Sequence, residues 1–180
     1  MDAILPALLA VLLAETGGHT QALVHLSGHD RGLNRTAAAL LLTTVIGLGI
    51  AAFGGSAIAH LLTPDARQLL TGLALVFAGA PMLLPVRAAK SPTGFLIPAL
   101  ARSQFGDASQ FIVFAIAARA DMPVLAMTGG VFGVLAAMLP PLLMDTTWPG
   151  KMPLALLRTG AAILLLICGI ALGIGALRLI

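Results

Sequence analysis

Two short polar stretches interrupt long apolar segments of this chain. The first is Glu15-Thr-Gly-Gly-His-Thr-Gln21, and the second, Gln104-Phe-Gly-Asp-Ala-Ser-Gln110, follows at an offset of 89 residues (104 − 15). Each combines a carboxylate with glycine, a hydroxyl and an amide. Ionisable residues inside membrane helices are rare and by default mark an ion or proton pathway. We therefore expect Glu15 and Asp107 to face each other at mid-membrane within one pathway.

Oxygen ligands of this kind suit hard divalent cations such as Ca²⁺, Mg²⁺ and Mn²⁺. A buried carboxylate pair can also take up protons, because burial and mutual repulsion favour the neutral form. The same oxygens could therefore bind a metal or protons, which is the competition that an antiporter requires. Glu15 and Asp107 are the expected metal ligands and proton acceptors. The expected neutral oxygen donors are Gln104, Thr20, Gln21, Ser109 and Gln110.

The residues beside the carboxylates have two interpretations. His19 could be a ligand or a proton relay, or it could simply pair with Glu15 one helical turn away. Asp107 could instead neutralise Arg102 or a helix end. The recurrence of the stretch favours a shared function over packing alone. The glycines of the two stretches are expected to loosen the backbone and to expose carbonyl oxygens as further ligands: Gly17, Gly18 and Gly106.

The composition requires a lipid environment. Of the 180 residues, 59% are hydrophobic and only 9% are charged, and the mean hydropathy is +1.03, whereas a soluble domain carries about 25% charged residues. The net charge of +3 does not indicate nucleic-acid binding, because the basic residues lie in loops between apolar runs, where they set topology. Cys168 is the single cysteine, which excludes a disulfide framework. No nucleophile and base pair in a way that would indicate an enzyme.

The apolar runs predict an all-α, polytopic membrane protein with six transmembrane helices, because a spanning helix needs roughly 20 apolar residues. Pro140 and Pro141 are expected to kink or end the fifth span, and Trp148 is expected to anchor the following loop at the membrane interface. The expected spans are 3–27, 36–62, 66–86, 94–119, 123–144 and 153–178.

The 89-residue offset divides the chain into two three-helix repeats, 1–87 and 95–180, joined by a linker at 88–94. Because each repeat has an odd number of spans, the second repeat must enter the membrane from the opposite side, as in transporters with inverted repeats. The loops after odd-numbered spans hold more Lys and Arg than the others, which places the linker in the cytoplasm. We expect the chain to lie in a bacterial inner membrane. The basic residues of those loops are Arg31, Arg35, Arg87, Lys90 and Lys151.

The two stretches resemble the motif E-x-G-D-[KR]-[ST], which occurs once in each half of a family of six-helix cation exchangers. That family includes the Golgi manganese/calcium transporter of eukaryotes and bacterial manganese exporters. The resemblance implies that Mn²⁺ or Ca²⁺ is exchanged for H⁺, with no tightly bound cofactor. Both motifs are degenerate here: Gly18 and His19 replace the aspartate and the basic residue in the first, and Gln104 and Ala108 replace the glutamate and the basic residue in the second. Such a divergent site would be complete only as a composite of both halves.

Two other functions stay open at this point. The chain could be a transport-inactive accessory or partner subunit of the membrane, or it could export a small organic solute, which would need a roomier central cavity. Its direct partners are expected to be the lipid bilayer, a divalent cation and protons, and the sequence leaves open whether it forms a homodimer.

Overall fold

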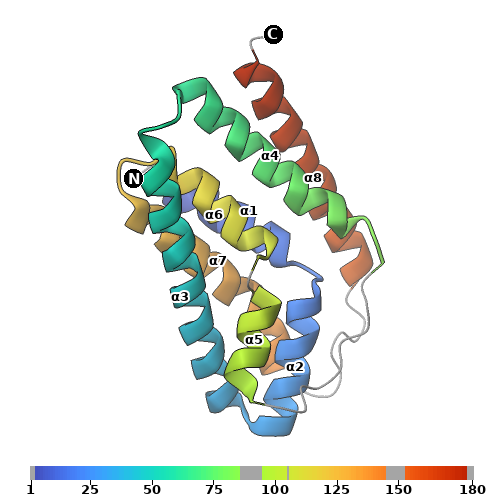
Figure 1. Ribbon diagram of the computed structural model, residues 1–180. Coiled ribbons are helices and arrows are strands. Elements are labelled where there is room, and N and C mark those ends of the chain that lie inside the picture. The colour runs from blue at the N-terminus through green and yellow to red at the C-terminus, as the bar shows by residue number, and fades with distance from the viewer. Residues whose placement is uncertain (1–2, 86–94, 105, 145–152, 178–180) are drawn as a thin grey trace.

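The computed structural model describes residues 3–85, 95–104, 106–144 and 153–177, and these residues form eight helices (Figure 1). Three of the described helices, α3, α7 and α8, are long and apolar enough to cross a membrane, and the bent pair α1 and α2 would make a fourth span. Together with the composition, this makes the chain a polytopic membrane protein. The helices are α1 (Ile4–Glu15), α2 (His19–Arg31), α3 (Leu33–Ala59), α4 (Pro64–Met82), α5 (Leu96–Gln104), α6 (Ala108–Ala117), α7 (Pro123–Leu143) and α8 (Leu154–Ala176).

The first and fourth expected spans are each broken at the polar stretch. The segments expected to span the membrane over 3–27 and 94–119 each contain two described helices and not one continuous helix. The chain turns by 76° between α1 and α2, and α5 ends at Gln104 before α6 begins at Ala108. Gly17 (φ 69°) and Gly106 (φ 76°) adopt left-handed backbone conformations, which no right-handed helix can include and which glycine adopts most readily. The two breaks therefore fall at the same motif position, 89 residues apart.

The other helices begin and end close to the expected positions. Thr63 caps α4 by accepting a hydrogen bond from the Ala66 N–H at 3.2 Å, with Pro64 in the first helical position, a combination that favours helix starts. α7 runs through Pro140 and Pro141 and ends at Leu143, so the prolines lie in its last turn. The predictions for the linker 88–94 and for Trp148 fall outside the described residues.

Each broken helix packs against the long helix of the opposite half. α1 and α2 contact α7, whereas α5 and α6 contact α3, and α4 lies along α8 on one side of the molecule (Figure 1). Glycines permit the closest approaches: a Cβ at Gly133 would lie 2.7 Å from Leu8 O, and Gly55 faces Phe114 O with no room for a Cβ. Small residues at helix contacts commonly serve this packing role in membrane proteins. The packing brings the two breaks, and with them the two polar stretches, together.

Candidate cation site

The two broken helices bring both carboxylates to one cavity. Glu15 is the last residue of α1 and is only 4% exposed, and Asp107 is the N-cap residue of α6 and is half-buried. Both line a cavity of about 510 Å³, and their charges lie close enough to interact. Residues 92 positions apart in the chain (107 − 15) thus meet at the ends of two helices.

The helix termini around the cavity contribute partial charges to it. α1 ends at Glu15 and α5 ends at Gln104, and a helix C-terminus carries partial negative charge that favours cations. On the other side of the second break, Asp107 Oδ1 accepts a hydrogen bond from the Ala108 N–H at 2.7 Å. The equivalent position in the first break is Gly18, which has no side chain to cap α2. The site is therefore asymmetric, and each half supplies the carboxylate that the other lacks.

Two glutamines stabilise the two helix breaks through equivalent hydrogen bonds. Gln21 Oε1 accepts from the Gly17 N–H at 2.9 Å, and Gln110 Oε1 accepts from the Gly106 N–H at 3.1 Å. Gln21 also donates from Nε2 to Ala137 O at 2.7 Å. That carbonyl has no partner in its own helix, because the residue four positions later is a proline without an N–H. The structure thus gives both glutamines a bracing role, in addition to the ligand role expected of them.

A second, much smaller space also borders Glu15. It measures about 10 Å³ and is lined by Glu15, Thr44, Gln104, Ser109 and Gln110, among others. The Ser109 hydroxyl hydrogen-bonds to the Glu15 side chain, and Gln104 Nε2 donates to Thr44 Oγ1 at 3.2 Å. A space of this size holds about one water molecule. Glu15 therefore borders both the open cavity and a pocket of about the size of a single small ligand.

The remaining predicted residues lie around the open cavity. His19 is exposed at the start of α2 and lies near enough to Asp107 for their charges to interact. Thr20 is buried and lines the same cavity, as do Gly18 and Gly106. Among the described residues, no three His, Cys, Asp or Glu side chains form a group that could hold a metal ion. A divalent cation would therefore need neutral oxygens and water beside the two carboxylates.

Sequence reasoning missed two polar residues of this region. Arg158 of α8 lines the open cavity and donates hydrogen bonds to Gly17 O at 2.9 Å and to Met82 O at 2.8 Å. It thereby ties the first break to the C-terminal end of α4. An arginine inside an expected span was the signal that could have found it. Thr44 of α3 is the second missed residue, and nothing in the sequence indicates that it meets Gln104.

The second half of the chain matches a known family. Residues 95–179, which contain α5 to α8, match the family model described as divalent cation/proton antiporter GDT1. The match covers 85 of the 180 residues (179 − 95 + 1), and it includes Asp107 and Arg158 but not Glu15. No curated protein and no solved structure matches the chain. The likeness to divalent cation/proton antiporters thus covers just under half of the chain.

Proposed function

We propose that this chain is a membrane antiporter that carries Mn²⁺ or Ca²⁺ in exchange for H⁺. The observation that carries the proposal is the meeting of Glu15 and Asp107, from two separate helix breaks, on one cavity inside an apolar helix bundle. Keeping two carboxylates in such a place costs about 2.5 to 3.5 kcal/mol each on insertion scales, which a dedicated cation site would justify. The family match of residues 95–179 supports the same function.

Charge balance explains how the site would exchange its substrates. Two ionised carboxylates neutralise one divalent cation, and two protons restore neutrality once the cation has left. Glu15 and Asp107 would bind both in turn, so metal and protons compete for the same oxygens. Ser109, Gln104 and Thr44 would add neutral oxygens next to Glu15, and Thr20 would add one at the open cavity. His19, close to Asp107, would pass protons between the site and water.

The two halves of the chain would be inverted repeats, with six spans in total. Two observations support this: the left-handed glycines at the same motif position, and the identical glutamine hydrogen bonds that brace them. Broken helices that meet near mid-membrane are typical of secondary transporters with this architecture. The open cavity lies on the side of Pro81 and Met82, where α4 leads into the linker. With the linker in the cytoplasm of a bacterium, the site would be open to the cytoplasm and poised for export.

A flux assay in proteoliposomes tests the function. An imposed pH gradient should drive uptake of Mn²⁺ or Ca²⁺ by the wild-type protein, and dissipating the gradient should stop it. Glu15→Gln keeps the side-chain size but removes the charge, so it should reduce this flux at least 100-fold. Thr128→Ala, a spanning-helix change whose hydroxyl bonds to Leu125 O, is the matched control. Wild-type flux in Glu15→Gln would refute the proposal.

A second candidate function is export of a small organic solute. The open cavity, at about 510 Å³, falls in the size range of small-molecule pockets. The same liposomes distinguish the two functions: flux of an amino acid that is independent of Mn²⁺, Ca²⁺ and Mg²⁺ would favour the solute exporter. A folded protein that moves neither class, and whose melting temperature does not respond to Mn²⁺ or Ca²⁺, would instead be an accessory subunit.

A further inference from the structure

α4 and α8 form a closely packed pair. A Cβ at Gly72 would lie 2.7 Å from Gly169 O, and a Cβ at Gly79 would lie 2.9 Å from Ala162 O, so the two backbones touch at both places. Gln68 Nε2 also donates to Leu172 O across the pair at 3.2 Å. Helices that leave no room for a Cβ between them cannot shift without separating, because packed cores do not deform continuously. We call α4 and α8 the paired arm.

The other six described helices pack together as a second unit, which we call the central body. The glycine contacts already described join α1 to α7 and α3 to α6. Gln104 ties α5 to α3 through Thr44, and Gln21 ties α2 to α7 through Ala137. His25 adds a further link, with Nδ1 3.0 Å from Pro141 O. Each broken helix is thus fastened to a long helix of the central body, although α6 also contacts α4 and α1 also contacts α8 of the paired arm.

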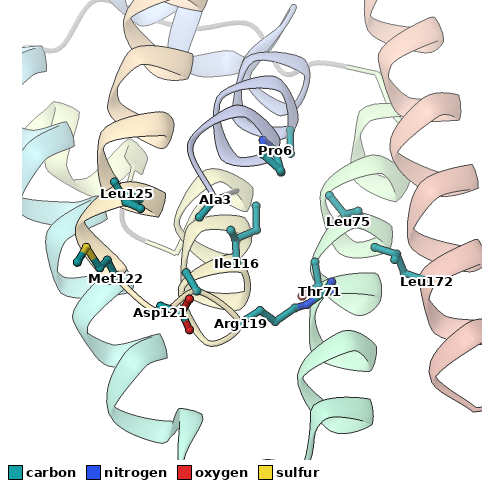
Figure 2. Close-up of a pocket in the computed structure, with 12 residues that line it drawn as sticks. Ala3, Pro6, Thr71, Leu75, Ile116, Arg119, Asp121, Met122, Leu125 and Leu172 are labelled. Carbon is teal, nitrogen blue, oxygen red and sulfur yellow. The ribbon is translucent and has the colours of Figure 1, made fainter. Parts of the chain in front are cut away.

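Two cavities lie along the seam between the paired arm and the central body. The open cavity with Glu15 and Asp107 is bounded on the arm side by α4 residues and by Arg158. A second cavity, of about 350 Å³, lies between the same two units but nearer the start of α4. Figure 2 shows residues that line it. Leu75 lines it from the paired arm and Ile116 from the central body. The seam is therefore hollow at two places.

The mouth of the second cavity carries two exposed charged side chains, although most of the cavity's lining is apolar. Thr71 lines it from the first half of α4, and Arg119 and Asp121 line it from the exposed turn after α6. Figure 2 shows Arg119 and Thr71 directed toward one another from these two elements. Thr71 Oγ1 also lies 3.4 Å from Ala115 O, a contact that crosses the seam. Charged groups at such a mouth suit a water-filled entrance.

A thin apolar seal separates the two cavities. On α1, Ala10 lines the second cavity and Ala14 lines the open one, a difference of four residues or about 6 Å of helix. On α6, Phe111 lines the open cavity and Ile116 lines the second one, and Ile112 and Ala115 between them are fully buried. About one helical turn of packing therefore blocks a passage through the molecule.

We propose that the second cavity is the far vestibule of the cation pathway, and that the paired arm rocks against the central body to open it while closing the first. This inference rests on the proposed antiport function. Rocking of one bundle against another around a fixed site is how transporters with repeats alternate access. In the conformation seen here the far side is shut. The Arg158 hydrogen bond to Gly17 O and the Thr71 contact with Ala115 O are the polar contacts that would break and re-form.

Thiol labelling tests the two vestibules without relying on transport. In a Cys168→Ser background, which removes the only cysteine, Thr71→Cys reports on the second cavity and Ser103→Cys on the open one. Ala120→Cys, at the mouth of the second cavity, is an additional probe. An impermeant thiol reagent should label Ser103→Cys from one side of the membrane and the other two from the opposite side. Labelling of all three from the same side, or no labelling at Thr71 and Ala120, would overturn the inference.

Cross-linking tests the rocking motion. A short bifunctional thiol reagent joining Leu75→Cys to Ile116→Cys should lower Mn²⁺ flux more than tenfold, while Mn²⁺ binding from the linker side persists. The control pair, Gln68→Cys with Gly175→Cys, lies within the paired arm and lines neither cavity, so joining it should change flux less than twofold. Undiminished flux in the cross-linked Leu75 and Ile116 protein would contradict the motion. No flux in the Cys168→Ser parent would instead refute the antiport function. The labelling would still show whether the two cavities open to opposite sides of the membrane.

Discussion

Thr43 and Thr44 are neighbours on α3, yet only one of them contributes to the candidate site. The Thr43 hydroxyl donates to Ala39 O at 2.9 Å within its own helix, which is the usual partner for a helical threonine. The Thr44 hydroxyl instead meets the Gln104 side chain and lines the small space next to Glu15. Both are threonines in the interior of the same helix, so only their tertiary contacts distinguish the structural residue from the candidate ligand.

Replacing each threonine by valine tests this difference. Thr44→Val keeps the shape but removes an oxygen from the small space and a partner from buried Gln104, at a cost of about 1 kcal/mol. We expect Mn²⁺ affinity to fall about fivefold. Thr43→Val should stay within twofold of wild type. Calorimetric titration of the purified protein measures both, and equal losses in the two variants would contradict the assignment of Thr44.

The three motif glycines give a graded test of the helix breaks. A side chain at the left-handed position of Gly17 costs about 1–2 kcal/mol, and its Cβ would also lie only 3.1 Å from Arg158 Cβ. Gly106 has the same backbone conformation but open space around it, and Gly18 has a negative φ of −81°. Substitution by alanine should therefore lower the unfolding free energy most at Gly17, less at Gly106 and least at Gly18. Thermal unfolding in detergent measures the order, and a Gly18 variant as unstable as the Gly17 variant would refute it.

The carboxylates of the site could be predicted from the sequence, but their neutral neighbours could not. Glu15 and Asp107 stand out because a charged group in an apolar run is costly and rare. Thr44 gives no such signal, because its partner lies 60 residues away along the chain and a helical hydroxyl normally bonds to its own helix. Arg158 did give a signal, since it interrupts an apolar run, but the carbonyl oxygens that it binds depend on how α8 packs.

At the scale of the helices, hydropathy located the apolar segments but did not predict where the helices are interrupted. The start of α4 at Thr63 and Pro64 follows from helix capping, which depends on neighbouring residues and can be recognised in the sequence. Only three residues of the chain separate α1 from α2, and only three separate α5 from α6, so a hydropathy average over about 20 residues does not detect the breaks. The glycines in both stretches were read as loosening the backbone, whereas they end one helix and allow the next to start in a new direction.

Two glycines of the paired arm should respond to alanine in opposite ways. Gly160 lies on an exposed part of α8, and a Cβ there would meet nothing within 4 Å. Gly160→Ala should stabilise the protein by about 0.5–1 kcal/mol, because alanine favours helix over glycine. Gly72→Ala should destabilise it by about 1–3 kcal/mol, because its Cβ would lie 2.7 Å from Gly169 O. Thermal unfolding compares the two, and a stabilising Gly72→Ala would show that α4 and α8 are not in close contact.

At the scale of the whole molecule, the site exists only because the two halves interlock. α1 contributes Glu15 while packing on α7 of the second half, and α6 is capped by Asp107 while packing on α3 of the first half. The 89-residue offset between the motifs predicted that the stretches are related, and the matching glutamine bonds are consistent with that relation. The separate packing of α4 with α8 was not predictable, because it depends on backbone contacts that glycine content alone does not assign to partners.

The central claim is that Glu15 and Asp107 form one composite cation site, and Mn²⁺ affinity in a double-mutant cycle tests it most directly. Groups that hold the same ion act as a unit, and their mutational effects do not add. Glu15→Gln and Asp107→Asn should each weaken Mn²⁺ binding at least 100-fold, and the double variant should be at most a few-fold weaker than either one. Wild-type affinity in one of the single variants, or two losses that simply multiply in the double variant, would contradict a shared site.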